Sequence, residues 1–124
     1  RLPTAEEWEV AAGFAPATQR AYRFPWGDQF DPLLANSSAT AGHATQPVAQ
    51  YHPFGNSPFG LTDMAGNVAE WTATTSVENT NGYLVKGGSF KDDSTALQIN
   101  VRQAVDRQTA EDWLGFRCSK TLPD

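Results

Sequence analysis

Sulfur and positive charge are both scarce in this sequence of 124 residues, which contains one cysteine, Cys118, and one methionine. A single cysteine excludes an internal disulfide and a zinc site built from several thiolates, because both need partners at fixed spacings. Nine lysines and arginines stand against 14 aspartates and glutamates, a net charge of −5. This balance excludes a protein that binds nucleic acid through a basic surface.

Long apolar runs are also missing. The longest are only a few residues, far short of the roughly 20 residues that span a bilayer, and the first residues do not form a charged and then apolar leader. We therefore expect no direct membrane insertion. The 40% hydrophobic content and 14 aromatic residues are typical of one globular domain.

A short helix is predicted at the start of the chain. Thr4 followed by Glu7 is a capping box, in which the hydroxyl accepts from a first-turn amide and the carboxylate accepts from the cap amide. An apolar face led by Trp8 follows, and Gly13 ends the pattern. The sequence thus predicts a helix from Thr4 to about Gly13.

Proline and glycine recur at short intervals over residues 16–60, which predicts loops there. The aromatic residues Phe24, Trp26 and Phe30 are expected to anchor these loops, because aromatic rings bury much area with few rotatable bonds. The prediction is a loop-rich α+β domain. Strands are expected around Leu84–Val85, Gln98–Val105 and Leu114–Cys118.

Five separated segments, taken in order, resemble the family of formylglycine-generating enzymes, also called sulfatase-modifying factors. The resemblance implies a C-type-lectin-like fold for residues 1–124, as a single domain. It also implies that the family's N-terminal portion is missing, so the chain corresponds to the C-terminal half to two-thirds of such a domain. The segments are RLPTAEEWE (1–9), FPWGD (24–28), FGLTDMAGNVAEW (59–71), KGGSF (86–90) and LGFRC (114–118).

A calcium site is predicted in the third segment. Asp63 and Glu70 offer carboxylates, and Gly66 and Val68 offer carbonyl oxygens, which are the hard donors that calcium prefers. The twelve-residue loop of an EF-hand is absent. The resemblance implies a structural calcium ion at these same four positions. The alternative is that the two carboxylates accept hydrogen bonds within the loop and no metal binds.

The resemblance implies a second and weaker calcium site. It would use the Asn36 side chain, the Ser37 carbonyl, an acidic side chain at the position of Thr40 and the Gly42 carbonyl. Thr40 offers no carboxylate, and the lost charge weakens a site for a hard cation. Calcium is thus the expected cofactor, in a structural role. A bacterial periplasmic or extracellular location would suit it.

The copper-dependent members of the family oxidise a substrate cysteine with two cysteines that follow the Gly-Gly-Ser motif. Thiolates are the ligands that Cu(I) needs. Those positions fall near Asp92 and Leu97 here, so the catalytic pair is absent. Cys118 is expected to pack as a small hydrophobic residue in a strand.

Other polar residues are interpreted as structural. The acidic pair Asp92-Asp93 is expected to pair with arginines across irregular loops. His43 and His52 lie apart, without the spacing of metal ligands, and are expected at the surface or in hydrogen bonds. The arginines concerned are Arg102, Arg107 and Arg117.

Three functions remain open from the sequence. The first is a non-catalytic, calcium-stabilised lectin-like scaffold that binds a protein or another ligand, or has a structural role in an assembly. The second is an oxidoreductase, either a formylglycine-generating enzyme or a relative of the iron-dependent sulfoxide synthases of ergothioneine biosynthesis, whose three-histidine site lies in a separate upstream domain. The third is a variable ligand-binding protein of a diversity-generating retroelement, with residues 90–113 as the variable surface.

Overall fold

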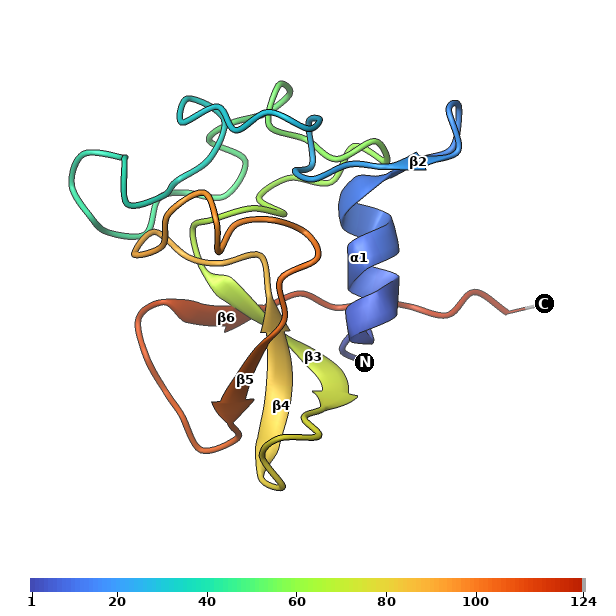
Figure 1. Cartoon of the computed structure of the whole chain (residues 1–124), viewed down its shortest axis with the longest axis vertical. Coiled ribbons are helices and arrows are strands. Elements are labelled where there is room, and N and C mark those ends of the chain that lie inside the picture. Colours follow the sequence, from blue (N-terminus) through green and yellow to red (C-terminus); the bar gives the residue numbers. More distant parts are fainter. Residues whose placement is uncertain (124) are drawn as a thin grey trace.

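The computed structural model describes residues 1–123, which form a small α+β fold with one helix and two sheets (Figure 1). This confirms the predicted class. None of the helical residues described is part of a segment long and apolar enough to cross a membrane. The elements are α1 (Ala5–Gly13), β1 (Phe14–Ala15), β2 (Arg20–Ala21), β3 (Ala69–Thr75), β4 (Gly82–Lys86), β5 (Gln103–Asp106) and β6 (Leu114–Phe116).

The larger sheet has the strand order β5-β4-β3-β6, and β1 pairs with β2 in a separate hairpin. Strand β4 is antiparallel to both of its neighbours, β3 and β5, whereas β6 runs parallel to β3. The loop after β5 therefore crosses to the opposite edge of the sheet before β6 begins (Figure 1). In the β3–β4 ladder Glu70 lies opposite Lys86, so their side chains are neighbours on one face.

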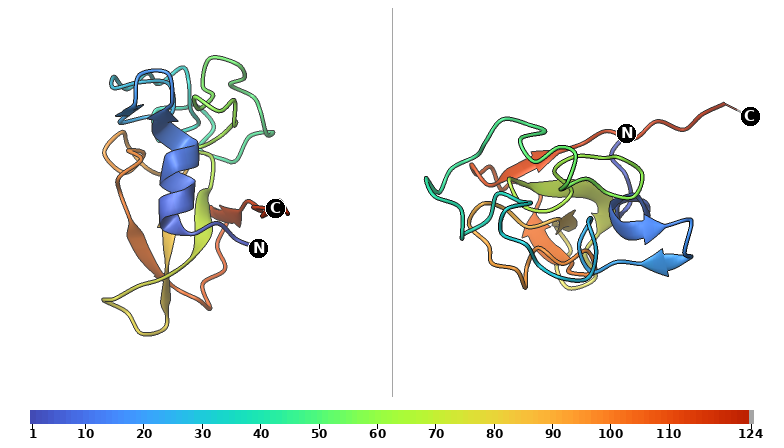
Figure 2. Two further views of the ribbon diagram at one scale, coloured as in Figure 1. Left: turned by 90° about the vertical axis from the view of Figure 1, so that its right-hand side faces the viewer. Right: turned by 90° about the horizontal axis from the view of Figure 1, so that it is seen from above.

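Helix α1 forms as the capping box predicts. The Thr4 hydroxyl accepts from the Glu7 amide at 3.1 Å, and the Glu7 carboxylate accepts from the Thr4 amide at 2.9 Å. Two hydrogen bonds from the Arg1 guanidinium, each 2.7 Å, and that of the Thr4 amide lower the pKa of Glu7 to about 2. The helix packs along the sheet through Trp8, which is 1% exposed (Figure 2).

The loops gather at one end of the molecule, away from the turn between β3 and β4 (Figures 1 and 2). Phe24 stacks on Trp26 with ring centroids 5.6 Å apart, and Phe30 packs against both. Behind them lie Ala35 and Leu97, which are buried. The predicted aromatic anchoring of the loops is confirmed.

Some predicted elements differ from the observed ones. The strand expected at 98–105 begins only at Gln103, because the Ile99 and Val101 carbonyls accept from a side chain instead of a neighbouring strand. The strand expected at 114–118 ends at Phe116. The longest strand, β3, was not expected, since its first residues were interpreted as part of a metal-binding loop.

A buried lysine connects α1, β4 and the turn at residues 99–101. The Lys86 side chain is fully buried and its ammonium donates to Glu9 at 2.7 Å and to the Ile99 and Val101 carbonyls at 2.6 Å each. Burial lowers the pKa of Lys86, and the hydrogen bond to Glu9 opposes that change. Burial would raise the pKa of Glu9, but hydrogen bonds from Arg102 and Lys86 outweigh it and the net change is downward.

Replacing this ammonium should destabilise the fold. We expect Lys86→Met to cost about 3 kcal/mol, because it leaves the buried Ile99 carbonyl and the partly buried Val101 carbonyl without this donor and removes the buried partner of Glu9. The matched control is Lys91→Met, which breaks an exposed pair with Asp112 and should cost about 0.5 kcal/mol or less. Urea unfolding would measure both, and equal costs would contradict a structural role for Lys86.

Candidate functional site

The Gly-Gly-Ser motif follows β4 and lies between the helix and the loops. Gly87 has φ +92° and Gly88 has φ +66°, a backbone conformation that side chains rarely adopt. A Cβ on Gly87 would lie 3.1 Å from the Trp8 ring, and one on Gly88 would lie 2.9 Å from Leu97. The backbone therefore approaches neighbouring side chains closely at both glycines, directly after β4.

The first position of the family's cysteine pair is used to close a turn. Asp92 accepts from the Ser89 amide at 2.8 Å and from the Ser89 hydroxyl at 3.0 Å. The Asp92 carbonyl also accepts from the Ser38 amide at 2.9 Å, which ties this turn to a distant loop. Ser89 is buried. Asp92 is thus structural, as expected.

The second position is part of the core. Leu97 is completely buried and packs with Phe24, Ala35 and Ala65. Neither position therefore offers a thiolate. A small hollow of about 150 Å³ next to the Asp92 turn is lined by Ser89, Lys91, Asp92, Gln103 and Trp113.

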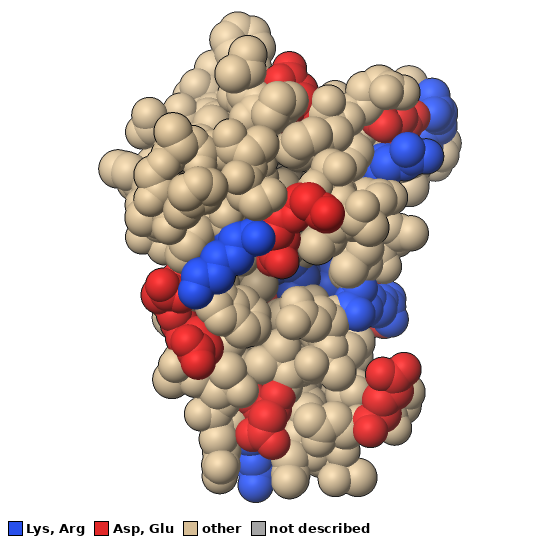
Figure 3. Space-filling model, turned by 60° about the vertical axis from the view of Figure 1, so that its left-hand side comes forward, with Lys and Arg blue, Asp and Glu red and all other residues tan. Residues whose placement is uncertain are grey.

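The surface around this hollow carries both positive and negative side chains. Lys91 pairs with Asp112 across the hollow at 2.7 Å. On the face shown in Figure 3, acidic and basic side chains are interspersed over the lower and right-hand parts, whereas the upper left part is almost uncharged. Such a surface does not favour a strongly charged partner.

Glu70, a predicted calcium ligand, accepts three hydrogen bonds from the protein itself. The carboxylate is 5% exposed on β3 and accepts from the Trp8 indole at 2.7 Å and from two Arg117 nitrogens at 2.6 and 2.7 Å. Arg117 also donates to the Thr62 and Asp63 carbonyls at 3.0 and 3.3 Å. The guanidinium thus neutralises Glu70.

The other three groups of this set lie close along the chain, on the loop that leads into β3. Asp63 accepts from the Ala49 amide at 2.7 Å, and Gly66 bridges to Asn36. In this arrangement the four groups fit calcium poorly. A calcium ion bound to the Glu70 carboxylate would lie close to the positively charged Arg117 and would compete with it for the same oxygens. Among residues 1–123, no group of three or more His, Cys, Asp or Glu side chains could hold a metal ion.

The second predicted set contains one group that would suit a cation. Asn36 is buried, and its amide nitrogen donates to the Ala44 carbonyl at 2.8 Å and to Asn67 at 3.0 Å. Its Oδ1 atom has no hydrogen-bond partner within the described part of the chain. Buried polar atoms are rarely left in this state, and a cation would satisfy the oxygen. Ser37 and Thr40 lie in the same turn, while Gly42 lies further along in an exposed loop.

Two expectations about single residues are wrong. Cys118 is exposed and lies beyond the end of β6, so it does not pack in a strand. Within residues 1–123, neither member of the acidic pair binds an arginine, and Asp93 accepts from the Thr95 amide at 2.9 Å. Arg102 pairs instead with Glu6 and Glu9, and Arg117 with Glu70.

The histidine expectation is confirmed. His43 and His52 are both exposed, and a ring nitrogen of His52 lies 2.9 Å from the Asn56 amide nitrogen.

The sequence model of the sulfatase-modifying factor enzyme 1-like domain matches residues 1–122. A mouse protein named inactive C-alpha-formylglycine-generating enzyme 2 is 34% identical over 137 residues, which cover 98% of this chain and 43% of the mouse protein. The hercynine oxygenase of Mycolicibacterium thermoresistibile is 45% identical over 75 residues, or 60% of this chain and 16% of that enzyme. The chain therefore spans less than half the length of these relatives.

Among solved structures, Treponema denticola variable protein 1 is similar with a TM-score of 0.81 and 24% identity, over 94% of this chain and 45% of that chain. This likeness concerns the fold alone. It agrees with the C-type-lectin-like fold that the sequence predicted.

The contact between Glu70 and Arg117 gives a direct test of the first calcium site. Glu70→Gln should cost about 3 kcal/mol in free energy of unfolding, because it leaves the guanidinium without its counter-ion. The cost should be equal in calcium and in chelator, and Arg117→Gln should show strong coupling to Glu70→Gln in a double-mutant cycle. The exposed Glu111→Gln is the control. A cost that is seen only in calcium would instead make Glu70 a calcium ligand.

Proposed function

Because the chain belongs to the sulfatase-modifying factor enzyme 1-like domain family, we propose that it is a non-catalytic member that binds a protein ligand through its loop-rich end. The observation that carries this proposal concerns the two positions where the copper-dependent enzymes have cysteines. Here Asp92 closes a turn and Leu97 is buried. Copper chemistry needs thiolates at both. The similarity to a relative named inactive supports the same conclusion.

The loop-rich end has the character of a binding surface. Long loops that are packed onto a rigid scaffold commonly carry binding residues. Three large apolar side chains in these loops are about four-fifths exposed: Leu33, Val48 and Phe54 at 79%, 81% and 78%. Exposed apolar side chains mark a protein contact where they gather on one surface, and these three lie in loops at the same end of the molecule. We therefore favour a protein partner over a small ligand at this end.

The proposal is tested by an activity measurement with copper. Purified protein loaded with Cu(I) would be incubated with a cysteine-containing sulfatase peptide, and aldehyde formation would be followed by mass spectrometry. We expect no aldehyde above the level of free copper, and no copper retained after Cys118→Ser removes the exposed thiol. Aldehyde formation that scales with protein concentration would overturn the proposal.

We also propose that calcium binds weakly at the Asn36 loop. The buried Asn36 oxygen without a donor supports this, and the absence of a carboxylate at Thr40 limits the affinity. Sites with few charged ligands bind calcium with dissociation constants of about 10⁻⁴ to 10⁻³ M, a range that is useful in extracellular modules. A periplasmic or extracellular location would be consistent with such a site.

Restoring the missing charge should strengthen this site. Thr40→Asp is expected to raise calcium affinity by about tenfold, since it adds a negative charge near the ion. Thr40→Asn is the neutral control of the same shape and should leave the affinity close to that of the parent. Isothermal titration with calcium and thermal unfolding with and without chelator would measure both. Identical titrations for the two variants would remove this loop as a calcium site.

A second candidate is that the chain is part of an iron-dependent oxygenase. The local identity of 45% to a hercynine oxygenase favours it. The iron ligands would then come from upstream sequence. A three-histidine helical domain encoded before Arg1 would support this candidate, and its absence from the gene would remove it.

The third hypothesis, a variable ligand-binding protein in which residues 90–113 vary, has less support. Phe90, Leu97 and Ile99 are all buried, so free variation of this segment would disturb the core. A near-copy of the coding segment downstream in the genome would nevertheless decide the point.

A further inference from the structure

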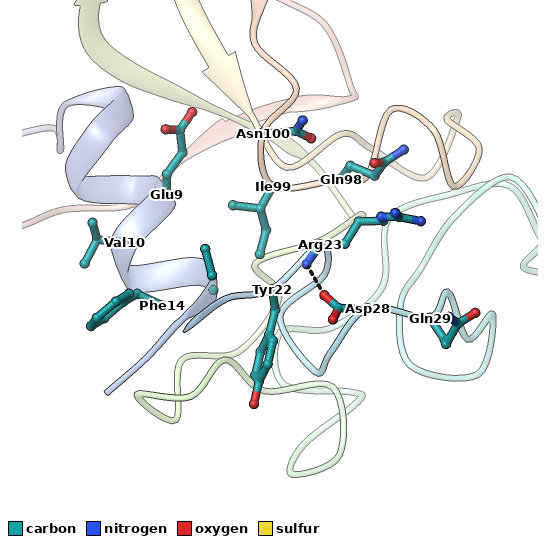
Figure 4. Close-up of a pocket in the computed structure, with 12 residues that line it drawn as sticks. Glu9, Val10, Phe14, Tyr22, Arg23, Asp28, Gln29, Gln98, Ile99 and Asn100 are labelled. Carbon is teal, nitrogen blue, oxygen red and sulfur yellow. Dashed lines mark hydrogen bonds between the residues drawn. The ribbon is translucent and has the colours of Figure 1, made fainter. Parts of the chain in front are cut away.

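A cavity of about 670 Å³ is lined by neither of the two residues at the cysteine positions (Figure 4). It is bounded by the last turns of α1, the β1–β2 hairpin with residues 22–29, and residues 98–100. Small-molecule sites in proteins commonly measure roughly 300–1,000 Å³. The volume is therefore sufficient for a small organic ligand.

One part of the cavity wall is apolar. Ile99, which is buried, and the partly exposed Phe14 and Tyr22 line it. Gly13 lets the helix end lie close to Ile99, since a Cβ there would overlap the end of the Ile99 side chain. An apolar ligand body could lie against this wall and lose water contacts.

The charged side chains that line the cavity are paired with opposite charges, with one exception. Glu9 is paired with Lys86 and Arg102. Asp28 accepts from Arg20 at 2.9 Å and from the Arg23 amide at 3.0 Å, the bond drawn in Figure 4. The Arg23 guanidinium has no hydrogen-bond or ion-pair partner among residues 1–123. The wall therefore carries one unbalanced positive charge.

Neutral polar groups accompany this charge. Gln98 and Asn100 come from one turn and Gln29 from another, and all three line the cavity with Arg23 (Figure 4). Their side-chain amides have no partner in the part of the chain that is described. Carboxamides of this kind can donate to an oxyanion or accept from a hydroxyl.

We propose that this cavity binds a small organic carboxylate with an apolar body. The Arg23 guanidinium would pair with the carboxylate, because its fork of N–H groups matches the two oxygens of that group. The apolar part would lie against Ile99 and Phe14. This inference does not depend on the proposed function, since the cavity and the cysteine positions use different residues.

The test compares two probes that differ only in charge. ¹⁵N-labelled protein would be titrated with 3-phenylpropionate and, separately, with the neutral 3-phenylpropionamide, and amide shifts would be followed by NMR. We expect saturable shifts at Arg23, Gln29 and Asn100 with the carboxylate, and at least tenfold weaker binding of the amide. Equal binding of both probes, shifts centred elsewhere, or no saturable shift with the carboxylate would overturn the proposal.

Two variants locate the effect. Arg23→Gln should reduce carboxylate binding to the level of the amide, whereas the matched Arg20→Gln removes an arginine that does not line the cavity and should retain binding. Val10→Trp, at a half-exposed position on the rim, should block both probes without touching the charge. Arg23 is exposed, so a dispersed spectrum is expected for its variant. Unchanged binding in Arg23→Gln or in Val10→Trp would contradict the assigned site.

Discussion

The fold depends on one tryptophan that lies between two buried ionic groups. Trp8 donates its indole hydrogen to Glu70 at 2.7 Å, and the Lys86 ammonium lies 5.5 Å from the centre of its ring. Glu70 and Lys86 are opposite each other in the β3–β4 ladder, so the ring covers both. This single side chain thereby fixes helix α1 against the sheet and covers the charges that the sheet presents.

The two buried charged side chains contact different parts of the chain. Glu70 binds Arg117, which lies just after β6, and Lys86 binds the turn at residues 99–101. A buried charge is costly unless its partners are in place, so these contacts select one arrangement of the surrounding segments. We infer that specificity of this kind matters here, because the chain has few regular elements whose packing could select the arrangement alone.

Local features were predictable from the sequence and distant pairings were not. The capping box joins residues three apart, and the aromatic anchors of the loops lie within seven residues, so both were visible in the sequence. Glu70 and Arg117 are 47 residues apart, and neither sequence segment contains a pattern that predicts their pairing. Strand β3 was missed because its first residues were interpreted as part of a metal-binding loop, and its partner strands lie far along the chain. The cavity likewise combines three separate segments.

The two positions that correspond to the family's cysteine pair have structural roles in this chain. Asp92 keeps the turn after the Gly-Gly-Ser motif closed with hydrogen bonds, and Leu97 fills the core. Both residues thereby stabilise the fold. In this chain the two positions therefore hold the surrounding loops in place through hydrogen bonds and packing.

The case of Glu70 explains why a metal site is difficult to infer from this motif alone. A carboxylate and neighbouring carbonyl oxygens can bind a metal ion, and they can equally accept hydrogen bonds from a positively charged side chain. In this structure the Arg117 guanidinium contacts the Glu70 carboxylate and the carbonyls of Thr62 and Asp63, which are the types of oxygen that calcium would use. Arginine also brings directed hydrogen bonds that an ion lacks. The motif therefore specifies a cation, and residues far along the chain decide whether that cation is a metal or a side chain.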